Sequence, residues 1–418
     1  MFKAILYRIL LIFPSSFFAL LDYQSNGYLE KVTYLYIFIT LSILILSLIK
    51  NSLIQVLTIS CFLIVFLQPA FKYFYVDKQT KLFPPNLKIL VETDHEDLEE
   101  KFFVTFDKFG YRNTGHNIDD LMNKNIDKVY VLIGASTFEQ TFIADKKTTA
   151  GLLQEYFHVS GFNHVVLNTG VSGTRMAHFI DHIKTIRMRV SSDTKVFYII
   201  MIGINDWNHA IRSKHSNRDK NTLMFKNSRN WKSKDSILNP NDFVLTNLVK
   251  AIYHKVISID ADRKYNFRSQ YKNVFNTYRN KEKFELNDND YNKMISWYKK
   301  AISLLVNECN SDKKSSCIFL DQIHSYNLNY KNDINHLNSI WLTPSRHTKA
   351  LSYEGLVKNA KVFNNALISH LDKEKCISCE VHEISTLMNN KIYFYDDVHL
   401  NNFGAHKLYQ VIKKIVGY

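Results

Sequence analysis

Short apolar runs rich in β-branched residues alternate with amphipathic stretches through the C-terminal part of this 418-residue chain. The apolar runs predict five strands, the last being the weakest pattern: Val129–Ile133, His164–Leu167, Lys195–Ile202, Ser316–Leu320 and Cys379–Ile384. The amphipathic stretches predict helices: Thr148–His158, Thr174–Val190, Asp288–Asn307, Ser352–Leu371 and Asn402–Val416. Apolar strands that alternate with helices are typical of a parallel sheet covered by helices on both faces. We therefore predict an α/β domain over residues 125–418, preceded by a linker and leading segment over residues 76–124.

Two uncharged runs near the N-terminus, Val32–Ile49 and Ser52–Phe71, each have the length of a membrane-spanning helix. A third apolar run, Ile9–Leu21, follows Lys3 and Arg8. No small-residue cleavage site follows this run, so we interpret it as an uncleaved span rather than a signal peptide. Residues 1–75 are therefore expected to form a transmembrane anchor of about three helices.

The charges that flank these runs predict their orientation. Lys3, Arg8 and Lys50 fall on one side of the predicted membrane, whereas Asp22 and Glu30 fall in the opposite loop. Basic residues favour the cytoplasmic side, and an odd number of spans then places the rest of the chain outside. We expect a multi-pass protein of the cytoplasmic (inner) membrane, in contact with the lipid bilayer, with its α/β domain extracytoplasmic or periplasmic.

The chain is basic, with a formal net charge of +14, of which +2 falls in the first 71 residues and +12 in the remainder. This excess indicates either a lysine-rich solvated surface or attraction to anionic lipid heads or an acidic glycan. Nucleic acid is not expected as a partner of an extracytoplasmic domain. Part of the charge lies at 208–241, within a basic insertion around 208–285, which is interpreted either as a solvated loop or as a lid over an acidic substrate.

Chemically active residues follow four of the five predicted strands. The blocks are Gly134-Ala135-Ser136, the turn 168–174 with its two glycines, Gly203-Ile204-Asn205-Asp206, and Asp396-Asp397-Val398-His399. Because the carboxyl ends of parallel strands meet at one edge of a sheet, where such folds bind ligands, we expect these blocks to converge.

The converging residues are those that ester chemistry requires. A serine hydroxyl needs an imidazole to accept its proton, so Ser136 is the candidate nucleophile and His399 the candidate base. Asp396, three residues earlier, can orient the second ring nitrogen of His399. Asp397 competes for this role, but the spacing favours Asp396, and Asp397 is expected to be solvated.

An oxyanion needs preorganised hydrogen-bond donors. The candidates are the backbone N–H groups of Ser136 and Gly173 and the side-chain amide of Asn205. Gly170 competes with Gly173, and the position just before the predicted helix favours Gly173.

These four blocks, in this order, resemble those of the SGNH/GDSL hydrolases. The resemblance runs from about Asp107 to the C-terminus and includes Phe109-Gly110-Tyr111-Arg112, which is similar to an element that precedes the first strand in many bacterial members. The chain departs from the family at Ala135, where aspartate is usual. The resemblance implies a three-layer α/β/α, flavodoxin-like fold and esterase, lipase or acyl-transfer activity without a metal or other cofactor.

Two further patterns remain open. His178 and His182, one helical turn apart, could bind a metal, but a solvent-facing pair is the simpler interpretation. Four exterior cysteines can form two bridges in an oxidising compartment. The local pairing joins Cys309 to Cys317 and Cys376 to Cys379, and two crossed pairings are possible. Cys61 lies in a predicted span and is expected to be inert.

Together these patterns predict a membrane-anchored extracytoplasmic serine hydrolase that acts on an acylated carbohydrate or another small ester. Acetyl is the favoured acyl group, on a cell-surface or nascent glycan. The alternatives are an O-acyltransferase with the same triad, and a non-catalytic glycan-binding or assembly partner that keeps the fold.

Overall fold

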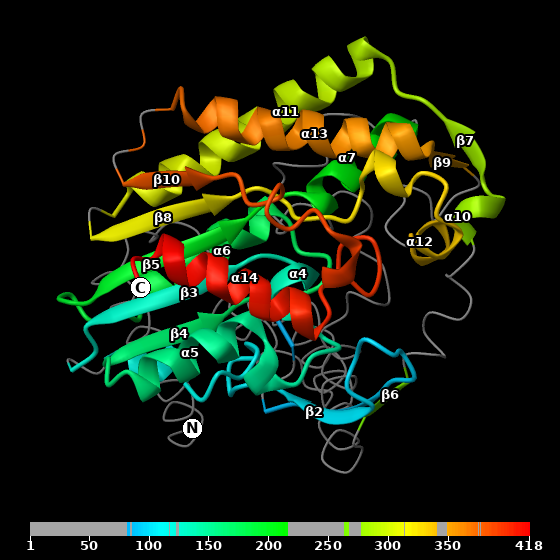
Figure 1. Ribbon diagram of the computed structural model, residues 1–418. Helices are drawn as coiled ribbons and strands as arrows, with labels where there is room; N and C mark the ends of the chain where they lie inside the picture. The colour runs from blue at the N-terminus through cyan, green and yellow to red at the C-terminus, as the bar shows by residue number, and fades with distance from the viewer. Residues whose placement is uncertain are drawn as a thin grey trace, which may run out of the picture. The chain divides into compact units, whose positions relative to one another are not determined.

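In the computed structural model, five parallel strands form the central sheet in the order β10-β8-β5-β3-β4 (Figure 1). Their bounds are β3 Lys128–Ile133, β4 His164–Asn168, β5 Lys195–Met201, β8 Ser315–Leu320 and β10 Cys379–His382. The five predicted strands are therefore confirmed, with ends shifted by one or two residues. Counted along the chain from the opposite edge, the strand order is 2-1-3-4-5, which is the flavodoxin-like order.

The structure describes residues 82–83, 86–116, 118–122, 125–215, 263–266, 277–312, 314–340, 349–374, 376 and 378–418. All of them belong to one unit, Gln79–Ile237 with Val249–Tyr418. The predicted anchor, Cys61 and most of the basic insertion lie outside the described residues. Among the helices that are described, none combines the length and apolar character needed to cross a membrane.

Helices cover both faces of the sheet, as the alternation of strands and helices predicted (Figure 1). Val129, Val131 and Ile133 of β3 belong to the core on one face. That face is covered by α6 Met176–Arg187, α7 Ile204–His215, α11 Asp288–Asn310 and α13 Tyr353–Leu371. Tyr130 and Leu132 belong to the core on the other face, beneath α5 Thr149–Val159 and α14 Asn402–Ile415. The sheet is thus buried on both sides, which explains why its strands are continuously apolar.

Polar side chains define where four of these helices begin. Thr148, Asn287, Ser352 and Asn401 each accept a hydrogen bond from a backbone N–H in the first turn of α5, α11, α13 and α14, respectively. Such a cap typically stabilises a helix by about 1 kcal/mol. Asn401 is the most relevant to function because it fixes the start of α14 two residues after His399.

Two strands of the leading segment and one from residues 263–266 form a second, smaller sheet that was not predicted from the sequence. β1 Lys88–Glu92 pairs antiparallel with β2 Lys101–Thr105 and parallel with β6 Arg263–Asn266. Ile89 and Val91 of β1 and Phe102 and Val104 of β2 are buried in a core of their own. The described part of the predicted linker and leading segment, residues 76–124, thus contains β1, β2 and the short helix η1 Ile118–Met122. In KILVE and KFFVT three consecutive apolar residues stand between polar ends, and the period-two alternation of a half-buried strand shows only in their burial.

Both disulfides follow the local pairing, and the two crossed pairings are not formed. Cys309 at the end of α11 is bonded to Cys317 in β8, and Cys376 is bonded to Cys379. The remaining described elements are short: η1 Ile118–Met122, α4 Ser136–Glu139, η2 Asp145–Lys147, α10 Thr277–Asn280, β7 Glu282–Phe284, η4 Leu328–Tyr330, α12 Ile334–Ser339, β9 Lys349–Leu351 and η5 Lys391–Tyr393.

Candidate active site

Ser136, His399 and Asp396 form one chain of hydrogen bonds. Ser136 is the first residue of α4, directly after β3 and the Gly134-Ala135 turn. The Nε2 atom of His399 lies 2.7 Å from Ser136 Oγ, and its Nδ1 atom lies 2.5 Å from Asp396 Oδ2. The structure therefore brings together the three residues that the sequence placed at strand ends. In this arrangement the imidazole can accept the serine proton while the carboxylate orients the ring.

The turn that carries His399 is rigidly built. Asp396 Oδ1 accepts hydrogen bonds from the backbone N–H groups of Val398 and His399, at 2.9 and 2.7 Å. The ring of Tyr395 stacks on the His399 ring, with centroids 5.7 Å apart. Asp396 thus fixes both the backbone of the turn and the orientation of the imidazole that projects from it.

The site is nearly closed to solvent, with Asp396 at 2% and His399 at 5% exposure. Burial by itself lowers the pKa of His399. The charge of Asp396 and its hydrogen bond outweigh burial, and Asp397 and Glu139 act in the same direction, so the pKa lies above the ordinary value of 6.5. The imidazolium that would form during catalysis is therefore stabilised.

The two glycines of the turn 168–174 lie in different environments. The N–H of Gly170 donates to Asn168 Oδ1 at 2.9 Å, and a Cβ at Gly170 would lie 2.4 Å from the backbone nitrogen of Glu139. Gly170 is thus used for close packing against α4. Gly173 has a left-handed φ of +76° and is exposed, which suits the oxyanion role predicted for it.

Asn205 is held in place by the residue that follows Gly173. Its Nδ2 atom donates to the carbonyl of Thr174 at 3.0 Å. A side-chain amide carries two N–H donors, so the second remains for an oxyanion. Asn205 and Gly173 are therefore linked through Thr174 at the same edge of the sheet.

Asp397 is buried rather than solvated, which corrects the expectation from the sequence. It has 0% exposure, and its Oδ2 accepts a hydrogen bond from the Tyr326 hydroxyl at 2.5 Å. Its carbonyl also accepts the backbone N–H of Ser325. The loop after β8 covers it, a contact that local spacing could not reveal.

The profile of the family described as GDSL-like lipase/acylhydrolase matches residues 130–412. This region contains all four blocks that form the site. The chain belongs to the GDSL-like lipase/acylhydrolase family. It is a serine ester hydrolase, as the resemblance predicted. No curated protein sequence matches the chain.

Several solved structures are similar at low identity. A member of the lipolytic G-D-S-L family from Veillonella parvula has 11% identity and a TM-score of 0.36, with 70% of this chain and 100% of that chain covered. An acetyl xylan esterase variant from Geobacillus stearothermophilus has 10% identity and a TM-score of 0.33, covering 71% and 97%. A carbohydrate acetylesterase family member from Sinorhizobium meliloti has 11% identity and a TM-score of 0.33, covering 70% and 100%. Similarity at this level does not extend to substrate.

The raised pKa of His399 predicts how this GDSL-like hydrolase responds to pH. We expect kcat/KM for p-nitrophenyl acetate to fall on acidification with a midpoint above 6.5, because a protonated imidazole cannot accept the Ser136 proton. Asp396→Asn removes the charge that raises this pKa. The variant should therefore have a lower midpoint and, by analogy with serine triads generally, about 10⁴-fold lower kcat.

The exposed carboxylate of Asp193 provides the control, since Asp193→Asn should leave the pH profile unchanged. A wild-type midpoint at or below 6.5, or an unchanged profile for Asp396→Asn, would contradict the assignment of Asp396 and His399.

Three residues that connect the segments of the site were not predicted as site residues from the sequence. Arg112 is buried, pairs with Asp145 and donates to the carbonyls that follow the nucleophile helix. Glu139, at 2% exposure, accepts a hydrogen bond from the backbone N–H of Ser172. Arg112 lies in the element 109–112 that the resemblance includes, but no local pattern marks Glu139.

The third is Gln322, in the loop after β8. Its Nε2 donates to Thr137 Oγ1 at 3.2 Å, and its Oε1 accepts the N–H of Ile204 at 3.2 Å. It therefore joins the nucleophile helix to the block that contains Asn205. Gln322 follows the fourth predicted strand, the only one of the five after which the sequence predicted no block of site residues.

His178 and His182 do not form a solvent-facing pair, which corrects the simpler interpretation. His182 has 0% exposure, its Nδ1 lies 3.3 Å from the Tyr111 hydroxyl, and burial lowers its pKa to about 3. His178 Nδ1 instead accepts the backbone N–H of Arg175. Within the described ranges, no group of side chains could hold a metal ion.

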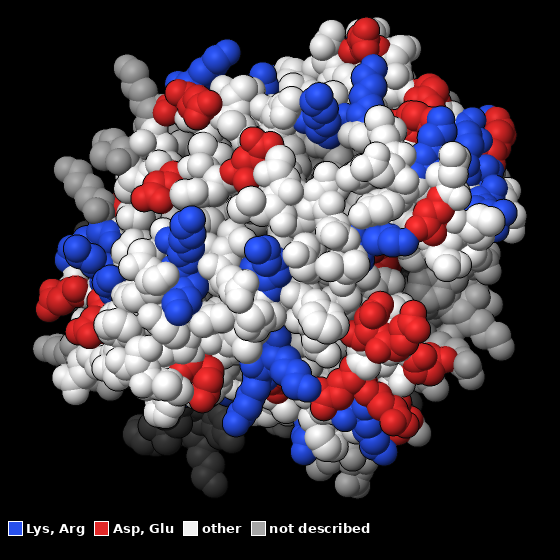
Figure 2. Space-filling view, in the orientation of Figure 1, with Lys and Arg blue, Asp and Glu red and all other residues white. Residues whose placement is uncertain are grey.

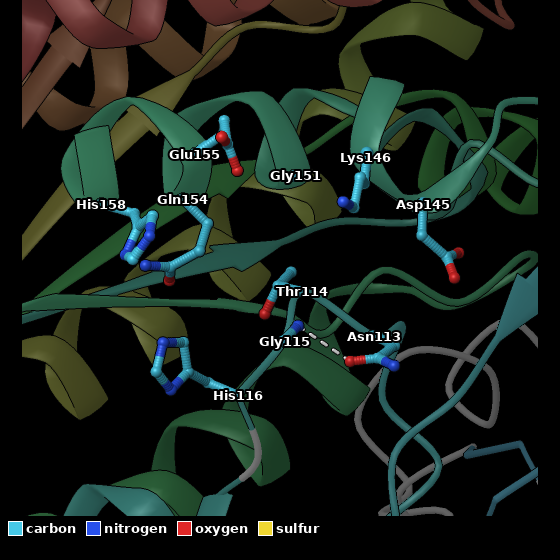
Figure 3. A pocket seen from close by; sticks show the side chains of 10 residues that line it. All are labelled: Asn113, Thr114, Gly115, His116, Asp145, Lys146, Gly151, Gln154, Glu155 and His158. Carbon is cyan, nitrogen blue, oxygen red and sulfur yellow. Dashed lines mark hydrogen bonds between the residues drawn. The ribbon is translucent and has the colours of Figure 1, made fainter.

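A pocket of about 410 Å³ lies between segment 113–116 and helix α5. Figure 3 shows Gln154, Glu155 and His158 of α5 on one side and Asn113 and His116 on the other. Its lining includes no member of the triad. The pocket is therefore separate from the residues that carry the family's chemistry.

Proposed function

We propose that this chain is a membrane-anchored extracytoplasmic esterase that removes acetyl groups from a cell-surface or nascent glycan through an acyl-enzyme on Ser136. The observation that carries the catalytic part is the continuous set of hydrogen bonds from Ser136 Oγ through the His399 ring to Asp396.

In the first half-reaction, His399 Nε2 takes the Ser136 proton while Oγ attacks the ester carbonyl. The N–H groups of Ser136 and Gly173 and the amide of Asn205 stabilise the oxyanion. His399 then returns the proton to the leaving sugar oxygen, which leaves an acetyl ester on Ser136. In the second half-reaction, His399 takes a proton from water, whose oxygen attacks the acyl carbon. The bond from that carbon to Ser136 Oγ then breaks, His399 returns the proton to Oγ, and acetate leaves. Asp396 stays ionised throughout and holds the Nδ1–H.

The proposed location is supported by the uncharged runs of residues 1–75, with their flanking lysines and arginine. The two disulfides of the described domain also support it, because such bonds persist in oxidising compartments. An anchored domain reaches esters close to the membrane surface. Anchoring therefore favours, as the substrate, a glycan that is assembled at the membrane or attached to the cell surface.

The charge of the chain bears on the kind of glycan. Figure 2 shows basic and acidic side chains interspersed on the face seen in Figure 1. On the described part of this face the positive excess is therefore not gathered into one basic area. We accordingly propose recognition of the acetyl ester and its sugar, without requiring an acidic polymer.

The substrate class can be tested with the full-length chain in detergent or in isolated membranes. We expect turnover of p-nitrophenyl esters to decrease from acetate to butyrate to octanoate, and acetate to be released from an O-acetylated surface glycan. Faster turnover of octanoate would overturn the acetyl proposal. Transfer of acetyl to an added sugar acceptor in preference to water would identify an O-acyltransferase instead. A reporter fused after Tyr418 that is active only in the cytoplasm would overturn the location.

A further inference from the structure

Glu139 is a buried carboxylate that the catalytic steps above do not use. It lies one helical turn after Ser136 in α4, so the two side chains lie on the same side of the helix. Its Oε2 accepts the backbone N–H of Ser172, and its Oε1 accepts the Thr141 hydroxyl at 2.5 Å. Both partners are neutral donors, so a negative charge is held beside the nucleophile at 2% exposure.

The Ser172 contact is one of three that join the glycine turn to the nucleophile helix. Asn168 Nδ2 donates to the Phe138 carbonyl at 2.8 Å. Gly170 lies against the backbone of Phe138 and Glu139 too closely for any side chain. The Glu139 carboxylate makes the third contact, and it is nearest to Gly173, because Ser172 and Gly173 share a peptide bond.

We propose that Glu139 is a positioning residue for the oxyanion hole, whose carboxylate accepts the Ser172 N–H and so holds the residue before Gly173 in place relative to Ser136. This inference rests on the proposed acyl-enzyme route. Gly173 is exposed and has a left-handed backbone. The Thr174 hydroxyl, bonded to the Gly134 carbonyl, holds the turn after Gly173, and the Glu139 contact holds it before Gly173. A displacement of about 1 Å at a reacting centre can cost about 100-fold in rate.

The same carboxylate also acts on His399. The charged groups that raise the pKa of His399 are Asp396 and Asp397 of its own turn and Glu139 of α4. Arg112 pairs with the Asp145 carboxylate and donates to the backbone carbonyls of Glu139 and Gln140 at the end of α4. Removing the Glu139 charge should therefore lower the pKa of His399, an effect that a purely structural residue would not have.

The test compares Glu139→Gln and Glu139→Asp with the wild type on p-nitrophenyl acetate, with kcat expressed per active site titrated by a p-nitrophenyl phosphonate. For Glu139→Gln we expect kcat to fall about 10- to 100-fold, KM to change less than about 3-fold, and the acid midpoint of kcat/KM to move to lower pH. Glu139→Asp keeps the charge but shortens the reach to Ser172, so kcat should fall while the midpoint stays at the wild-type value. Glu380→Gln, at an exposed carboxylate of β10, is the matched control and should change neither quantity.

A Glu139→Gln enzyme with wild-type kcat per titrated site and a wild-type acid midpoint would overturn the positioning role. Titrating the active sites removes any loss due to misfolding from kcat. Failure of the proposed function is distinct, because the wild type would then show no turnover that depends on Ser136.

Discussion

Ser136→Ala is expected to lower kcat for p-nitrophenyl acetate by about 10⁴- to 10⁶-fold, the range seen when a serine nucleophile is removed from a triad. Without Oγ, His399 Nε2 loses its 2.7 Å partner and no acyl-enzyme can form. Residual activity would come from water attack on an ester still held by the oxyanion donors. The measurement is steady-state hydrolysis with the full-length protein, together with trapping of the acyl-enzyme by acid quench and mass analysis.

Ser160→Ala is the matched control, because Ser160 is an exposed serine at the end of α5. It should keep wild-type kcat and show the acyl adduct. Since the Ser136 hydroxyl is small, the Ser136→Ala protein should also keep its thermal midpoint. Equal rates for Ser136→Ala and the wild type would remove Ser136 from the mechanism.

Arg112→Met is expected to lower the free energy of unfolding by about 3–5 kcal/mol, the typical cost of breaking a buried ion pair by removing one partner. The Arg112 guanidinium has 0% side-chain exposure and lies 2.7 Å from Asp145 Oδ1. It also donates to the carbonyls of Glu139 and Gln140, at 2.9 and 3.2 Å. These carbonyls lie at the end of the nucleophile helix. Loss of the hydrogen bonds that Arg112 donates to them should therefore reduce activity as well as stability.

Urea unfolding followed by circular dichroism measures this change. Arg279→Met provides the control at an exposed arginine and should stay within about 0.5 kcal/mol of the wild type. Adding Asp145→Asn to Arg112→Met should recover part of the loss, because it removes the unpaired charge. An Arg112→Met protein as stable as the wild type would contradict this role for Arg112.

Much of the fold followed from local pattern. Four of the five strands of the main sheet were recognisable because they are buried on both faces and are therefore almost continuously apolar, whereas the edge strand β10 is less buried and gave the weakest pattern. The antiparallel pair of β1 and β2 was missed because its strands are short and half-buried, and each begins with a lysine. Such short strands are stable only when one face packs against other parts of the chain, and a run of five residues does not show where that packing occurs.

The candidate site likewise contains features that local sequence patterns predicted and features that they did not. The blocks that contain Ser136, Asn205 and His399 could be placed at one edge because the alternation of strands and helices predicts parallel strands, whose carboxyl ends meet there. The predictions that Asp397 and His182 are exposed to solvent were wrong. Their burial depends on contacts with Tyr326 and Tyr111, each 71 residues away in the sequence.

The sequence by itself determined the alternation of strands and helices, the family and the side chains presented at the strand ends, because periodicity and motif spacing are local properties of the chain. The tertiary structure alone decided that Asp397 is buried against Tyr326, that Arg112 supports the end of the nucleophile helix, and that Glu139 joins this helix to the glycine turn. Those features depend on burial and on hydrogen bonds between segments far apart in the chain. Such contacts exist only after the layers have packed.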